Sequence, residues 1–141
     1  MMLLALAILQ SANPVVMTRE PHAASPWTQS VRARCGNAEI AIEGYGAGRP
    51  LDRAPRLRLN GRPVAGDAVE RLLDDLAHRS AVYRVQVLCG QGGEITVRID
   101  EGEKRAGGPV RYRSGGALIR GNRLVSYTGL EASDADSFWF R

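Results

Sequence analysis

Residues 83–100, YRVQVLCGQGGEITVRID, decide the fold that this sequence predicts. Apolar and polar side chains alternate on both sides of residues 90–93, a short glycine-rich segment. Alternation with a period of two is typical of a strand with one buried face, and a glycine-rich break between two such runs predicts an antiparallel hairpin. Cys89 falls on the apolar side of the first run, so we expect its sulfur to face the core.

A second cysteine, Cys35, ends another alternating run. Residues 31–35 alternate apolar and arginine side chains, with Cys35 on the apolar side. The apolar side then shifts to even numbers, so Gly36 and Asn37 predict a turn or a bulge. In an exported protein a Cys35–Cys89 disulfide is favoured, whereas in the cytosol two buried free thiols would be expected. A bridge across a loop of this length would stabilise the fold by about 4 kcal/mol.

The remaining turns, strands and helix are predicted from residue patterns between and after these two runs. Asn60-Gly61 predicts a tight hairpin, and Pro63 places its return strand at a sheet edge. Asp67 with Glu70 forms a capping pair, followed by an apolar stripe that predicts one amphipathic helix over residues 67–79. Three segments are expected to interrupt or turn the chain: a glycine-rich loop over residues 44–50, a charged break over residues 100–105, and a hairpin turn at Gly121-Asn122.

These elements together predict an α+β fold. We expect a mostly antiparallel sheet of six to eight short strands, with the helix packed on one face and one disulfide. The aromatic tail, residues 138–140, is expected to close the core, with a binding epitope as the alternative.

The N-terminal region is interpreted as a secretory leader. The apolar run over residues 2–9 is far shorter than the ~20 residues that span a bilayer, so no transmembrane span is expected. The predicted organisation is a signal peptide over residues 1–24, a connector over residues 25–30 and a single domain over residues 31–141. Since no basic residue precedes the apolar run, a packed N-terminal strand or helix is the alternative. The predicted location is the periplasm or the exterior.

The chain carries a formal net charge of +4, and all its basic residues except Lys104 are arginines. The guanidinium fork matches carboxylate and phosphate oxygens two at a time. Outward arginines on the predicted strands are therefore candidate contacts for an envelope protein, an anionic glycan or a lipid headgroup, with ordinary solvated polar residues as the alternative. They are Arg56, Arg58, Arg84, Arg98, Arg111 and Arg113. A nucleic-acid partner is not expected, because the excess is small and no recognition motif is present.

No catalytic, cofactor or metal site is predicted. The two cysteines and the two histidines, His22 and His78, lack the spacing of zinc ligands. The glycines of residues 44–48 are not followed by a helix start or a phosphate-binding lysine, which argues against a nucleotide. The sequence therefore predicts a small exported non-catalytic binding module. An inhibitor of an extracytoplasmic hydrolase that presents the 44–50 loop is one alternative. A small hydrolase of unknown type, with a polar pocket that contains His78 or a carboxylate pair, is the second, and a structural protein without a ligand is the third.

Overall fold

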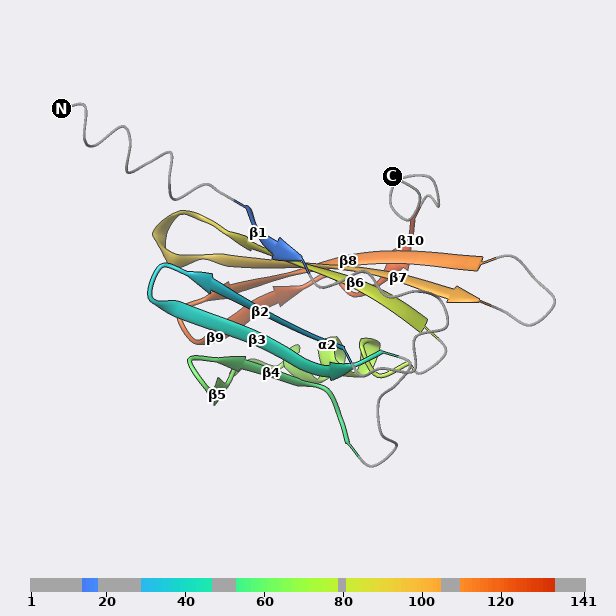
Figure 1. Ribbon diagram of the computed structural model, residues 1–141, viewed down its shortest axis with the longest axis horizontal. Helices are drawn as coiled ribbons and strands as arrows, with labels where there is room; N and C mark the ends of the chain where they lie inside the picture. The colour runs from blue at the N-terminus through green and yellow to red at the C-terminus, as the bar shows by residue number, and fades with distance from the viewer. Residues whose placement is uncertain (1–13, 18–28, 47–52, 79–80, 105–109, 134–141) are drawn as a thin grey trace.

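The computed structural model describes residues 14–17, 29–46, 53–78, 81–104 and 110–133 (Figure 1). This part of the chain forms ten strands and one α-helix. The strands are β1 (Pro14–Met17), β2 (Gln29–Cys35), β3 (Ala38–Tyr45), β4 (Arg56–Leu59), β5 (Arg62–Pro63), β6 (Ala81–Cys89), β7 (Ile95–Lys104), β8 (Val110–Arg120), β9 (Arg123–Tyr127) and β10 (Glu131–Ala132). The helix is α2 (Val69–Asp75), and a 3-10 turn, η1 (Gln91–Gly93), joins β6 to β7.

The strands form two antiparallel sheets rather than the single sheet expected. The larger sheet has the order β1-β6-β7-β8-β10, and β9 also pairs with β8. The smaller sheet has the order β2-β3-β4-β5. The β6–β7 hairpin confirms the prediction from residues 83–100, since Val85 pairs with Ile99 and Cys89 with Ile95. Alternation identifies a strand but not its neighbours, which is why it did not separate the two sheets.

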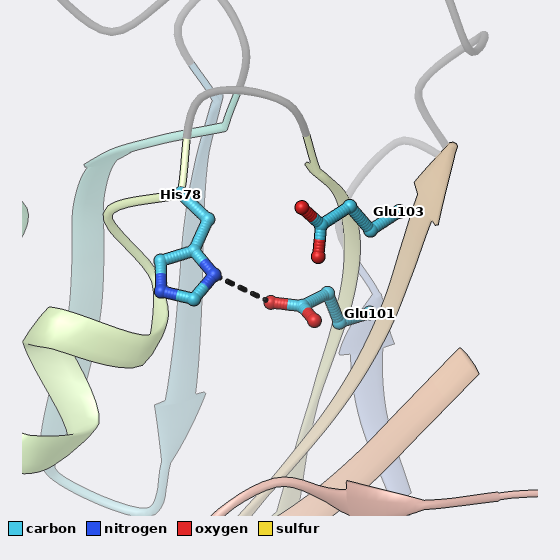
Figure 2. Close-up of side chains that lie close together, drawn as sticks. All are labelled: His78, Glu101 and Glu103. Carbon is cyan, nitrogen blue, oxygen red and sulfur yellow. Dashed lines mark ion pairs between the residues drawn. The ribbon is translucent and has the colours of Figure 1, made fainter. Parts of the chain in front are cut away.

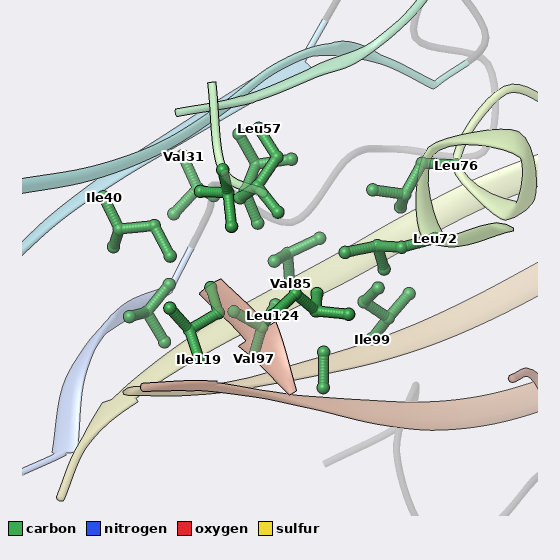
Figure 3. Packing of buried hydrophobic residues seen from close by; sticks show 14 of the residues in the cluster. Val31, Ile40, Leu57, Leu72, Leu76, Val85, Val97, Ile99, Ile119 and Leu124 are labelled. Atoms are coloured by element: carbon green, nitrogen blue, oxygen red, sulfur yellow. The ribbon is translucent and has the colours of Figure 1, made fainter. Parts of the chain in front are cut away.

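The core lies between the two sheets. Figure 3 shows Val31, Ile40 and Leu57 of the smaller sheet facing apolar side chains of the larger one. Each of these buried aliphatic side chains contributes about 1.5–3 kcal/mol to folding. The apolar side of the predicted alternation is therefore the inner side of each sheet.

Helix α2 packs beside this core and contacts β4 and β9 (Figure 1). Leu72 and, just after the helix, Leu76 are fully buried, as the apolar stripe predicted. The expected length of residues 67–79 was wrong, and so was the capping pair, because Ala68 precedes the helix without a side-chain cap. The Tyr83 hydroxyl ends the helix, since it donates to the Asp75 carbonyl oxygen at 2.5 Å and accepts from the backbone N–H of His78 at 3.2 Å.

Both predicted two-residue turns are present at the predicted positions. Asn60 and Gly61 both have positive φ, 52° and 79°, and connect β4 to β5. Asn60 also forms a hydrogen bond to strand β3, because its Oδ1 accepts from the Glu39 N–H at 2.8 Å. Pro63 lies in the two-residue edge strand β5, as expected. Gly121 and Asn122 turn the chain from β8 to β9.

The predicted disulfide is present. Cys35 and Cys89 are bonded, with 5.4 Å between their Cα atoms, and no described cysteine is free. Cys35 ends β2 of the smaller sheet and Cys89 ends β6 of the larger sheet. The bridge therefore joins the two layers covalently.

Two expected interruptions are instead parts of strands. β3 continues through Gly44 to the fully buried Tyr45, whose ring packs edge-on against Tyr83 at 6.1 Å between centroids. This contact extends the strand into the predicted 44–50 loop, of which residues 47–50 lie outside the described residues. The charged break over residues 100–105 was also wrong, because β7 runs to Lys104.

Several predictions fall on residues that the structure does not describe. They include most of the leader and connector and the aromatic tail over residues 138–140. Within the predicted leader, residues 14–17 form β1, which pairs with β6 at the edge of the larger sheet. Among the described residues, no helix has the length and apolar character needed to cross a membrane.

Candidate functional site

The C-terminal end of β7 and the N-terminal end of β8 lie side by side and carry charged side chains on the inner side of the larger sheet. Glu101 pairs directly with Arg113, and Glu103 pairs with Arg111. These positions continue the alternation of Val97 and Ile99, so their side chains point to the same side as the core. Opposite charges that face each other across two strands stabilise their pairing, which allows β7 to continue where the sequence suggested a break.

Glu101 is fully buried, and an arginine compensates its charge. Its Oε1 accepts from Nε of Arg113 at 2.7 Å and lies 2.6 Å from Nη2. Burial lowers the pKa of Arg113, but the hydrogen bond and the negative charge of Glu101 outweigh it and raise that pKa overall. Glu103 makes the equivalent contact with Nη2 of Arg111 through its Oε2.

His78 adds an imidazole to the carboxylates and guanidiniums at this end of the sheet. It follows helix α2, and its Nδ1 lies 3.5 Å from Oε2 of Glu101 (Figure 2). One ligand atom from each of His78, Glu101 and Glu103 lies within 4.8 Å of the others. We call these three residues with Arg111 and Arg113 the charged cluster.

Two tyrosines border the charged cluster. Tyr127 donates to Oδ2 of Asp75 at 2.5 Å, and the guanidinium of Arg71 lies 5.5 Å from the centre of its ring. Burial and then the hydrogen bond to Asp75 raise the pKa of Tyr127. Burial, followed by the charge of Glu101, raises the pKa of Tyr83. Both phenols therefore stay protonated and act as hydrogen-bond donors at neutral pH.

A second concentration of charge covers the outer side of the smaller sheet. The inner positions of β2 and β4 are buried apolar residues, so the alternating arginines point away from the core. We call this surface the arginine face, which consists of Arg32, Arg34, Arg56 and Arg58. Ala41 of β3 lies between two of these arginines, because it pairs with Arg32 on one side and Arg58 on the other.

The remaining predicted contacts, Arg84 and Arg98, lie on the outer side of the larger sheet around Asp100. Arg84 pairs directly with Asp100 across the strands, and Nε of Arg98 is 3.6 Å from its Oδ2. Burial raises the pKa of Asp100, although the hydrogen bond from Ser114 and the nearby arginines oppose the shift. A raised pKa in the fold means that ionisation of Asp100 at neutral pH opposes folding.

The six predicted arginines are thus divided among three places. Arg56 and Arg58 lie together on the arginine face, Arg84 and Arg98 surround Asp100, and Arg111 and Arg113 bind carboxylates of the charged cluster. The sequence reasoning missed Arg32 and Arg34, whose alternation already placed them outward, and the cluster around His78, which depends on pairing between distant segments.

No family model, curated protein or solved structure matches this chain. Its function is therefore inferred from the arginine face and the charged cluster.

Proposed function

We propose that the protein is an exported, non-catalytic binding module that engages an acidic polysaccharide through the arginine face. The observation that carries the proposal is the exposure of these arginines on one sheet surface. The side chains of Arg32 and Arg34 are 64% and 73% exposed, and Arg56 is also exposed. Residues two apart on a strand are about 7 Å apart, which suits repeated contacts with an extended polyanion.

The arginines of this face are available to an external anion. Arg32 and Arg34 make long ion pairs with Glu39 at 3.7 Å each, and Arg32 makes another with Glu43 at 3.9 Å; such pairs contribute about 0–1 kcal/mol. No ion pair with another described residue engages Arg56 or Arg58. An anion that replaces the weak internal pairs therefore gains more than it disrupts.

A soluble polyanion suits this surface better than a membrane. Among the residues whose side-chain exposure the structure describes, Val125 on β9 is the one large hydrophobic side chain that is exposed. Proteins that bind membrane surfaces use exposed apolar side chains together with basic residues. The arginine face supplies charge without such an anchor.

Replacing Arg56 and Arg58 together with glutamate is expected to weaken binding to polygalacturonate at least about tenfold, equivalent to about 1.4 kcal/mol. The measurement is isothermal titration calorimetry in low salt, because about 0.5 M salt screens such contacts. The matched control replaces Arg120 and Arg123 with glutamate, which changes the net charge equally at the β8–β9 turn. Equal loss in both variants, no binding by the native protein, or a preference for anionic vesicles would each contradict the proposal.

Export is supported by the disulfide, because such bonds persist in oxidising compartments. Because β1 pairs with β6, as the alternative of a packed N-terminal strand expected, the proposed cleavage lies upstream of Pro14, so that the sheet keeps this strand. The intact mass of the protein from its native host is therefore expected to lack the leader and the two thiol hydrogens. A full-length product with both thiols open to alkylation would contradict export.

A further inference from the structure

We infer that His78, Glu101 and Glu103 form a zinc site. The first argument is the separation of the donor atoms. The 3.5 Å between Nδ1 of His78 and Oε2 of Glu101 is long for a hydrogen bond. It matches the roughly 3.4 Å expected between two ligand atoms on a tetrahedral zinc ion with bonds of about 2.1 Å. A carboxylate oxygen of Glu103 lies within 4.8 Å of the ligand atoms of both other residues, so a small rotation of its side chain would complete the set.

The second argument is an unsatisfied atom of Glu101. This side chain has no exposed surface, and its Oε2 has no hydrogen-bond partner. A buried carboxylate oxygen without a partner costs about 1–3 kcal/mol, or more because it is charged. The atom points toward the imidazole of His78, as Figure 2 shows. A cation between the two side chains would satisfy it.

Arg113 is compatible with a cation because it binds the oxygen of Glu101 that does not face His78. Arg113 binds Oε1 of Glu101, which leaves Oε2 to the metal, and Arg111 binds Oε2 of Glu103. Partners of this kind orient carboxylate ligands in metal sites. The carboxylates of Glu101 and Glu103 balance the guanidiniums of Arg111 and Arg113, and Asp75 and Arg71 beside Tyr127 balance each other, so a cation would enter surroundings without net charge.

The ligand types favour zinc over magnesium or calcium. One imidazole nitrogen and two carboxylate oxygens suit zinc, whereas the lighter ions prefer oxygen ligands alone. The side chain of His78 is 42% exposed, which gives the ion a route in from solvent. With three protein ligands, the fourth zinc position is left to water. The sequence analysis predicted no metal site, so this inference differs from that expectation.

The experiment is titration of the oxidised full chain, without a histidine tag, with zinc chloride in excess magnesium chloride. We expect one zinc per chain and binding at least about tenfold weaker in both His78→Ala and Glu103→Gln. His22→Ala removes the other histidine of the chain and is the matched control, with less than about twofold change expected. Far-UV circular dichroism of each variant establishes that it is folded before the titration.

A second measurement reports the ligand directly. In protein labelled at histidine, we expect equimolar zinc to shift the imidazole resonances that are absent from His78→Ala. We also expect zinc to raise the melting temperature of the native chain but not that of His78→Ala. The inference is overturned if zinc does not bind, if His78→Ala binds it as tightly as the native chain, or if the shifted resonances belong to His22.

Discussion

Replacing Glu101 with alanine is expected to lower the free energy of unfolding by about 3 to 5 kcal/mol. The substitution leaves the guanidinium of Arg113, only 20% exposed, without the carboxylate that compensates its charge. Removing one partner of a buried ion pair has costs of this size because the other charge stays desolvated. The measurement is urea unfolding followed by circular dichroism, in the presence of a chelator so that metal binding does not contribute.

The exposed pair between Glu94 and Arg120 supplies the matched control. Its side chains are 39% and 59% exposed, so Glu94→Ala is expected to cost no more than about 1 kcal/mol. The double variant Glu101→Leu with Arg113→Met should recover most of the lost stability, because it removes both buried charges. Equal costs for Glu101→Ala and Glu94→Ala would show that burial does not control the strength of the inner pair.

Replacing Cys35 and Cys89 together with alanine is expected to lower the free energy of unfolding by about 4 kcal/mol. The bond closes a loop between residues 54 positions apart, and its loss allows the unfolded chain many more conformations. This is a large share of the roughly 5–15 kcal/mol by which ordinary domains are stable. The measurement is again urea unfolding, compared between the double variant and the native chain.

The native chain in a reducing agent is the control for this second substitution. It has the native side-chain atoms but no covalent link, so it should unfold at nearly the same urea concentration as the double variant. Unfolding of the reduced chain at the same midpoint as the oxidised chain would contradict a stabilising role for the bond.

The elements that could be predicted are those that local sequence determines. The alternation of residues 83–100 gave the central hairpin, and Asn60-Gly61 gave a turn because both positions accept positive φ. Cys35 and Cys89 could be paired because each lay on the apolar side of its strand. For the hairpin and the turn the information lies within a few residues of the feature, and for the disulfide the chain offers one possible pair because it has two cysteines.

The candidate sites depend on pairings between distant residues, and these were not visible in the sequence. In the sequence, Glu101 belongs to a charged segment that predicts a break in the strand. Only the pairing of β7 with β8 shows that Arg113 lies opposite it. In the sequence, His78 belongs to the last turn of a predicted helix. In the structure the helix ends about a turn earlier, where the Tyr83 hydroxyl bonds to the Asp75 carbonyl oxygen. The arginine face likewise requires β2 and β4 to flank β3, an order that alternation alone does not give.

The two ends of β6 are held in different ways. At Cys89 the larger sheet is tied to the smaller one by a covalent bond, and at Ala81 the strand begins beside Glu103 of the charged cluster. Among the described residues the sulfur bridge ties the two layers covalently, whereas at the charged end Tyr45 of β3 packs against Tyr83 of β6 without a covalent bond. An opening of the layers that keeps the bridge intact therefore has to break these noncovalent contacts.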